Sequence, residues 1–170
     1  MITIVRLDSI APAAVEALLD RAFEPGRHRR TAYIVRGDAH AIPTLSFAAC
    51  DGDALVGSIQ CWPVALATED GLALPLVLVG PVAVEPSHQM HGVGRRLMTA
   101  ALDAAAAHGL DDAMTLIGDP EYYGRFFGFT AARTGRWALP GPVERHRLLA
   151  RGPGVPDVAG MLGPRVAAAV

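Results

Sequence analysis

Cysteine is scarce in this sequence, with two among 170 residues. Asp51–Asp53 has the composition of a tight hairpin loop, and the register that it implies places Cys50 opposite Ala54 and Cys61 opposite Pro43. The cysteines would then lie about seven residues apart along the ladder, roughly 23 Å at about 3.3 Å per residue. A disulfide cannot close that gap. The sequence therefore predicts free thiols, which are typical of a reducing compartment.

The sequence also lacks a long uninterrupted apolar run. Its longest apolar tract, Leu72–Val84, is broken by Pro75, Gly80 and Pro81 and is too short to span a bilayer as a helix. The first residues do not show the basic segment and apolar stretch of a signal peptide. We therefore expect a cytoplasmic protein that has no membrane partner.

No excess of positive charge is present. The 15 basic and 17 acidic residues give a net charge of -2, which provides no broad electrostatic attraction for nucleic acid, and we expect no such partner. The densest basic run is Arg27–Arg30. Such runs usually lie on the solvated surface. The alternative is that this run faces an anionic substrate or a bound cofactor.

Length and composition indicate one folded domain over residues 1–170. Hydrophobic residues make up 51% of the chain and charged residues 19%, which is enough apolar surface for a single well-buried core.

The order of the expected elements is mixed α/β. Period-two and continuous apolar patterns predict strands, and period-3.6 patterns predict helices. Leu72–Val84 is apolar on both faces, as a central strand is, and Gly80-Pro81 within it implies a bulge or a local parting of neighbouring strands. Arg27–Pro43 is irregular and polar, which is typical of a surface segment at a substrate entrance. The expected strands are residues 2–6, 45–50, 54–62, 72–84, 113–117 and 145–150, and the expected helices are residues 11–23, 93–108 and 120–127.

A glycine-bearing loop between a buried strand and a helix carries the clearest functional signal. The strand ends at Val84, and the loop Gln89–Gly94 leads into a helix that opens with Arg95-Arg96. Helix N-termini present unpaired amides and partial positive charge, so this junction is an anion site. The loop matches neither of two better-known phosphate-binding loops. A P-loop needs Lys-Ser or Lys-Thr after its last glycine, whereas arginines follow Gly94. A dinucleotide fingerprint needs glycine or alanine at the position of Leu97.

This loop, Gln89-Met90-His91-Gly92-Val93-Gly94, resembles the Gln/Arg-x-x-Gly-x-Gly/Ala signature of the GNAT superfamily of N-acetyltransferases. The blocks Gly80–Pro86 before it and Gly118–Phe129 after it resemble a YhbS-like bacterial branch of that superfamily. The resemblance implies an α/β (α+β) GNAT fold, with a central mixed, mostly antiparallel sheet flanked by helices and a bulged, splayed fourth strand.

The resemblance also implies acetyl-CoA as cosubstrate, with the loop amides holding the pyrophosphate and the backbone near Val82 and Val84 pairing with the pantetheine arm. No metal is expected, because His88 and His91 are spaced three residues apart in a loop without further ligands. The cofactor-binding residues expected are Val82, Ala83, Val84, Gln89, Met90, His91, Gly92, Val93, Gly94, Arg95, Arg96, Asp119 and Tyr123.

Transfer of an acetyl group needs a deprotonated amine, a polarised thioester carbonyl and protonation of the departing thiolate. The resemblance makes Tyr123 the candidate acid. Its spacing to Gly128-Phe129 is one residue longer than usual, and since one residue turns a helix by about 100°, Tyr122 stays an alternative. Glu85 is a weak candidate base. Asp119 before Pro120 is also typical of a helix cap, and a water chain could replace a single base.

The predicted function is direct acetyl transfer in a ternary complex to a primary amine of a small molecule or a protein. A non-catalytic acyl-CoA-binding module is the alternative. Residues 27–43 and 134–142 are expected to recognise the acceptor. A homodimer could form through an exposed strand edge or the apolar C-terminal tail.

Overall fold

A computed structural model describes residues 1–165, which divide into two compact units. The first unit comprises residues 1–27, 41–61 and 80–109, and the second comprises residues 28–40, 62–79 and those from 110 onward. Strands β3 (Ala54–Ala67) and β4 (Ala73–Val84) run through both. That the chain is a single domain stays a prediction. The apolar C-terminal tail proposed for pairing lies outside the described residues.

Antiparallel strands form the sheet of the first unit. β1 (Ile2–Arg6) pairs with β2 (Phe47–Asp51), and β2 pairs with the first half of β3. Asp51 pairs with Ala54, so the hairpin loop has two residues rather than three and Cys50 lies opposite Leu55. The expected pairing of Cys50 with Ala54 is therefore wrong by one residue, because Asp51 belongs to the strand. A further register shift follows between Cys50 and Ala49. Both cysteines are free, and burial raises the pKa of the Cys61 thiol to about 12.

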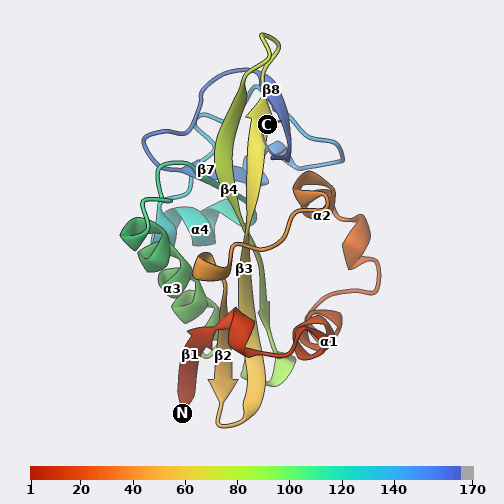
Figure 1. Ribbon diagram of the computed structural model, residues 1–170, viewed down its shortest axis with the longest axis vertical. Helices are drawn as coiled ribbons and strands as arrows, with labels where there is room; N and C mark the ends of the chain where they lie inside the picture. The colour runs from red at the N-terminus through yellow and green to blue at the C-terminus, as the bar shows by residue number, and fades with distance from the viewer. Residues whose placement is uncertain (166–170) are drawn as a thin grey trace, which may run out of the picture. The chain divides into compact units, whose positions relative to one another are not determined.

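Two helices, α1 (Pro12–Ala22) and α3 (Val93–Ala107), lie on opposite sides of this sheet (Figure 1). α1 packs Val15, Leu18 and Leu19 against Ala48 and Ala83. On the other face, α3 meets the sheet at Gly57, which is paired with Ala49. Adjacent residues of β2 thus contact different helices, as the alternation of side chains along a strand requires. Short 3-10 turns occupy Leu7–Ser9, Pro43–Leu45 and Pro86–His88.

Arg27, the first residue of the basic run, is not solvated surface. Its side chain is 3% exposed and forms ion pairs with Glu16 at 2.6 Å and Asp20 at 3.1 Å. Both carboxylates belong to α1. The guanidinium therefore fastens the chain after α1 to that helix, because a buried charge is stable only when it is paired.

In the second unit, β3 and β4 form a hairpin closed by a hydrogen bond from the Thr68 amide to the Leu72 carbonyl. β4 pairs in parallel with β5 (Met114–Ile117), and β5 pairs antiparallel with β7 (Leu148–Arg151). β8 (Gly160–Pro164) pairs antiparallel with the end of β3 and in parallel with β6 (Trp137–Ala138). The predicted mixed, mostly antiparallel sheet flanked by helices is therefore confirmed.

The ladder between β4 and β5 is short. Its pairs are Val77 with Met114 and Leu78 with Thr115, although β5 continues to Ile117. The pairing of β4 with β5 within residues 1–165 thus ends at Leu78, two residues before Gly80-Pro81, where the sequence predicts a bulge or a local parting of strands. A proline in β4 cannot donate to a ladder, which is the physical reason.

Two elements of the second unit are not predicted by the sequence patterns. α2 (Thr31–Arg36) forms inside the stretch expected to be irregular. A six-residue helix is unstable alone, and here the Arg36 guanidinium lies 3.8 Å from the ring centroids of both Tyr33 and Trp62. β8 lacks an alternating pattern and is held by strands on both sides. The strand expected at 145–150 begins at Leu148, because Arg145–Arg147 form a 3-10 turn.

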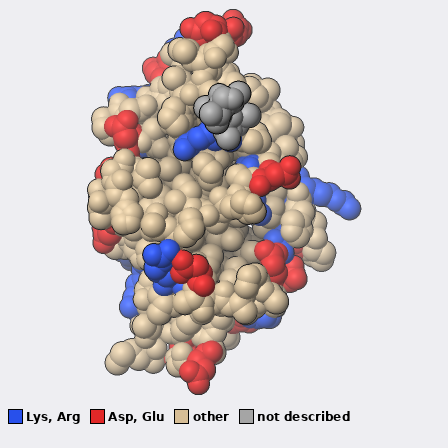
Figure 2. Space-filling model, viewed as in Figure 1, with Lys and Arg blue, Asp and Glu red and all other residues tan. Residues whose placement is uncertain are grey.

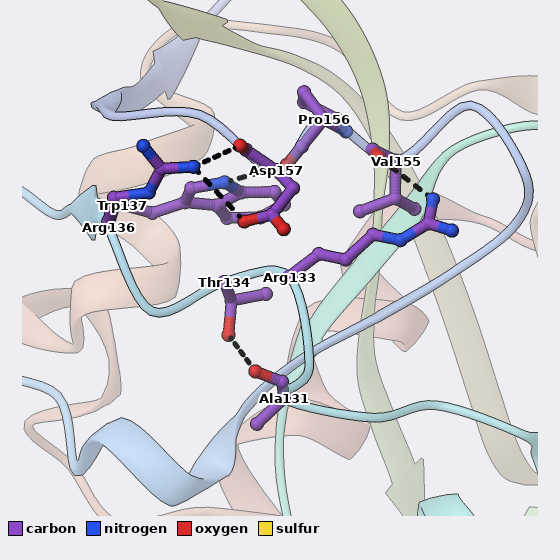
Figure 3. A network of polar contacts seen from close by, with 8 residues as sticks. All are labelled: Ala131, Arg133, Thr134, Arg136, Trp137, Val155, Pro156 and Asp157. Atoms are coloured by element: carbon purple, nitrogen blue, oxygen red, sulfur yellow. Dashed lines mark hydrogen bonds and ion pairs between the residues drawn. The ribbon is translucent and has the colours of Figure 1, made fainter.

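The segment after α4 (Pro120–Phe127) is anchored rather than loose (Figure 3). Trp137 is fully buried and donates from Nε1 to the Pro156 carbonyl at 3.2 Å. The Thr134 hydroxyl donates to the carbonyls of Leu148 at 2.8 Å and Ala131 at 3.4 Å. Thr134 and Trp137 of the expected recognition loop 134–142 are therefore buried, whereas Gly135 and Arg136 between them are exposed. Among residues 1–165, no helix has the length and apolar character to cross a bilayer.

We expect Gly57→Val to destabilise the protein by about 1–3 kcal/mol, because a Cβ at Gly57 would lie 2.9 Å from Val93 Cγ1 and 3.0 Å from Leu97 Cδ1. Chemical denaturation measures the change. Gly135→Ala is the control, since nothing lies within 4 Å of a Cβ there. Equal stability of the Gly57 variant and the wild type would show that α3 does not depend on this close approach.

Candidate functional site

The loop predicted to bind an anion begins where β4 ends. The Glu85 amide donates to the Val56 carbonyl at 2.8 Å, which holds the exit of β4 against β3. The backbone then reverses through Met90 and Gly92, both in the left-handed region with φ of 69° and 79°. Met90 is 99% exposed. A non-glycine residue in that region is uncommon and marks a turn whose shape is set by its surroundings.

Helix α3 begins directly after this turn, with Gly92 as its N-cap. Its first intrahelical bond runs from the Arg96 amide to the Gly92 carbonyl at 3.1 Å, so the preceding amides of Val93 and Gly94 have no acceptor within the helix. The first turn contains no acidic residue. Oriented amides and the helix dipole therefore make this end of α3 favourable for a phosphate group.

The structure brings the predicted strand and loop residues together. Gln89 Nε2 donates to the Val84 carbonyl at 3.3 Å, which ties the loop back to the strand. A Cβ at Gly94 would lie 3.8 Å from Val84 Cγ2 and 3.9 Å from Val82 Cγ1. Ala83 points to the other face, into the core beside α1, so only its backbone can face a ligand on this side.

The Arg96 side chain is hydrogen-bonded to the backbone of β1. Its Nη1 donates to the Ile2 carbonyl at 2.9 Å, and with Arg95, Thr99 and Asp103 it lines a cavity of about 370 Å³. On the face shown in Figure 2, charged side chains stand in small separate groups. No broad basic surface is visible on that face.

His88 fixes the turn that precedes the loop. Its Nε2 lies 3.1 Å from Asp51 Oδ2, and its Nδ1 lies 2.9 Å from the Ser87 hydroxyl. The hydrogen bond from His88, followed by the N-terminal amine, lowers the pKa of the Asp51 carboxyl. His88 therefore has a visible structural role, whereas His91 is exposed in the loop.

Glu85, the weak candidate base, is held in an ion pair. Arg21 Nε lies 2.8 Å and 3.1 Å from its two carboxylate oxygens. One Nε–H shared by both oxygens directs the carboxylate toward the guanidinium of α1. The geometry gives Glu85 a role in joining α1 to the end of β4.

The remaining predicted residues belong to the second unit, at the start of α4. Asp119 is the N-cap and accepts a hydrogen bond from the Glu121 amide at 3.0 Å, so its expected role as a cap is confirmed. The Tyr123 ring covers Gly118 so closely that a Cβ there would lie 2.5 Å from Tyr123 Cε2. Gly118 therefore makes room for the tyrosine, a role that the sequence pattern does not reveal.

Burial, with smaller effects from Tyr122 and Asp119, raises the pKa of the Tyr123 phenol to about 12, while the positive charge of Arg147 acts in the opposite direction. The phenol is consequently protonated throughout the neutral range and can donate a hydrogen bond. Tyr122 instead packs in an aromatic cluster, with ring centroids 4.9 Å from Tyr123 and 5.8 Å from Phe127.

Helix α4 ends in an ordinary C-cap. Gly128 is left-handed, its amide reaches the carbonyls of both Gly124 and Tyr123, and the Phe129 amide donates to the Tyr123 carbonyl at 3.2 Å. This is the usual bond pattern of a helix that stops at a glycine. The choice between Tyr123 and Tyr122 as the acid therefore stays a prediction.

Comparison with known proteins places this arrangement in a family. The model described as "Acetyltransferase (GNAT) family" matches residues 12–129. The chain belongs to the GNAT acetyltransferase family. The uncharacterized N-acetyltransferase YhbS of Escherichia coli K12 is 32% identical over 139 residues, which cover 79% of this chain and 80% of that protein.

Solved GNAT structures share the fold. A crystal structure of YhbS from Escherichia coli in complex with CoA matches with a TM-score of 0.71 at 24% identity, over 97% of this chain and 89% of its own. A GNAT acetyltransferase from Brucella melitensis in complex with acetyl-CoA matches with a TM-score of 0.56 at 24% identity, over 91% and 97% of the two chains.

We expect Gly118→Ala to destabilise this GNAT protein by about 1–3 kcal/mol by displacing the Tyr123 ring. In a Tyr123→Ala background the same change should cost almost nothing, because the ring that it meets is gone. A double-mutant cycle from chemical denaturation measures the coupling. Additive effects of the two substitutions would contradict the packing of Tyr123 on Gly118.

Proposed function

We propose that this protein is an acetyl-CoA-dependent N-acetyltransferase that moves an acetyl group to a primary amine of a small molecule or a protein, by direct transfer in a ternary complex. The observation that carries the proposal is the start of α3, where the left-handed turn at Gly92 leaves the Val93 and Gly94 amides without helical acceptors. The CoA and acetyl-CoA complexes of the two similar GNAT structures support it.

The residues around this loop fit the parts of the cofactor. Amides from Met90 to Arg95 would hold the pyrophosphate, with Gly92 and Gly94 allowing close approach of the backbone. Main-chain groups of Val82 and Val84 would pair with the pantetheine arm as an added strand. The Gln89 bond to the Val84 carbonyl keeps the loop and the strand in register for both tasks.

In the transfer step the amine nitrogen forms a bond to the thioester carbon, the carbon–sulfur bond breaks, and the proton lost by nitrogen balances the one gained by sulfur. We propose that Tyr123 assists the departing thiolate. A phenol with a pKa of about 12 holds its proton more firmly than an ordinary thiol with a pKa of about 8.5. Tyr123 therefore acts mainly as a hydrogen-bond donor to sulfur.

Removal of the amine proton is assigned to water, because Glu85 is ion-paired with Arg21. The same observation favours the alternative function, a non-catalytic acyl-CoA-binding module. Positioning of the two substrates can sustain turnover without a dedicated base, which is why the transferase is preferred.

Gly94→Glu should weaken acetyl-CoA binding at least about tenfold, through steric block and charge repulsion at the pyrophosphate. Gly94 is the better position for this test than Gly92, whose positive φ would add backbone strain. Calorimetric titration measures the affinity, and Gly135→Glu is the control. Unchanged affinity in the Gly94 variant would overturn the assignment of the phosphate loop.

Amine-dependent release of free CoA thiol, followed across a broad amine panel, separates the enzyme from the binding module. Tyr123→Phe should lower kcat by about 10²- to 10³-fold with little change in acetyl-CoA affinity, since it removes one hydrogen-bond donor to the developing thiolate, and Tyr122→Phe should have a smaller effect. The chain contains no lysine, so acetylation of its own side-chain amines cannot contribute to the signal. Binding of acetyl-CoA without amine-dependent release would favour the module.

A further inference from the structure

A cavity in the second unit has no role in the proposed handling of acetyl-CoA. Its volume is about 630 Å³, and its walls include Arg29 and Arg30 before α2, Glu144 and Arg147 before β7, and Ile117 at the end of β5. Pockets for small ligands have volumes of about 300–1,000 Å³. The cavity is therefore large enough for a small metabolite.

A hydrogen bond joins two segments that line this cavity, the start of α2 and the chain before β7. The buried Thr31 hydroxyl donates to the Pro142 carbonyl at 2.5 Å. A Cβ at Gly141 would lie 2.7 Å from the same hydroxyl oxygen, so the chain approaches Thr31 as closely as glycine allows. The cavity is thus a defined feature of the fold rather than a gap between loose loops.

Two residues of the cavity wall, Ile117 and Arg147, adjoin Gly118. The Arg147 carbonyl accepts a hydrogen bond from the Gly118 amide at 2.9 Å, and Gly118 is the residue that the Tyr123 ring covers. Ile117, which lines the cavity, immediately precedes Gly118. An amine acceptor bound in this cavity would therefore lie against Ile117, next to Gly118, on which the Tyr123 ring packs.

Positive charge dominates the cavity wall. Arg29, Arg30 and Arg147 face one carboxylate, Glu144, which is itself 3.4 Å from His146. Within residues 1–165, neither Arg29 nor Arg147 forms an ion pair with a protein carboxylate. Guanidinium groups recognise carboxylates and phosphates through paired hydrogen bonds, and the wall would repel a second cationic group on the ligand.

We propose that the acceptor is a small primary amine that carries a carboxylate or a phosphate, and that Arg29 and Arg147 hold this anionic group. The proposal rests on the proposed acetyltransferase function and names the substrate class of the same site. Arg147 and Arg29 are assigned to acceptor binding, and neither contacts the reacting atoms.

The test uses amines matched in length. γ-Aminobutyrate is compared with butylamine and 1,4-diaminobutane, and aminoethyl phosphate with ethanolamine, so that the two anions are separate arms. Thiol release should give at least about tenfold higher kcat/KM for one or both anionic acceptors than for the uncharged and dicationic amines. Equal or lower kcat/KM for both anionic amines would overturn the proposal.

Variants locate the effect. Arg147→Gln and Arg29→Gln should each raise KM for the preferred anionic acceptor about tenfold or more and leave KM for its uncharged analogue unchanged. Arg147→Lys should recover part of the loss. Arg6→Gln, which removes an exposed arginine paired with Asp8, is the matched control. A uniform loss for charged and uncharged amines would show a structural role instead.

A binding measurement keeps the inference independent of turnover. With the protein saturated with CoA, γ-aminobutyrate and aminoethyl phosphate are titrated calorimetrically into the wild type and into the Arg147→Gln and Arg29→Gln variants. Binding of an anionic amine that weakens in both variants, with CoA affinity intact, supports the proposal. Absence of binding by both amines overturns it, whereas failure of acetyl-CoA itself to bind would instead overturn the proposed function.

Discussion

Two adjacent residues of β3 set the geometry on which the candidate cofactor site depends. The Val56 carbonyl accepts the Glu85 amide and fixes the exit of β4, while Gly57, the next residue, lets Val93 and Leu97 of α3 approach the sheet. Residues 86–91 therefore connect two fixed points, through the 3-10 turn Pro86–His88 and the left-handed Met90. The two contacts together hold the start of α3, with its Val93 and Gly94 amides, near the end of β4.

A comparable constraint operates at the end of β5 in the second unit. The Gly118 amide bonds to the Arg147 carbonyl on one side, and the absence of a Cβ at Gly118 admits the Tyr123 ring on the other. Burial of the phenol there raises its pKa to about 12, which makes Tyr123 a donor of hydrogen bonds at neutral pH. The same segment forms part of the wall of a cavity that is also lined by Arg29, Arg30 and Arg147.

Local patterns in the sequence predicted the elements that carry strong periodicity or clear end signals. β1, α4 and the Asp119 cap were placed as observed, and α3 ends before Gly109. Elements stabilised mainly by distant partners were not predicted. α2 depends on the stacking of Arg36 between Tyr33 and Trp62, and β8 depends on pairing with β3 and β6, so neither leaves a signal in its own residues. The hairpin register was wrong by one residue because Asp51, expected in the loop, pairs with Ala54.

The sequence by itself determined the family and the position of the glycine-bearing loop that precedes α3, because the spacing of Gln89, Gly92 and Gly94 reflects the backbone needs of a helix start. Only the tertiary structure decided which surroundings and partners the charged side chains have. Arg27 is buried against α1, Arg29 lines a cavity, Glu85 is paired with Arg21, and Arg147 comes beside Gly118. The physical reason is that a charge acts through its partners in space, and these partners are up to 64 residues away in the chain, as Arg21 and Glu85 are.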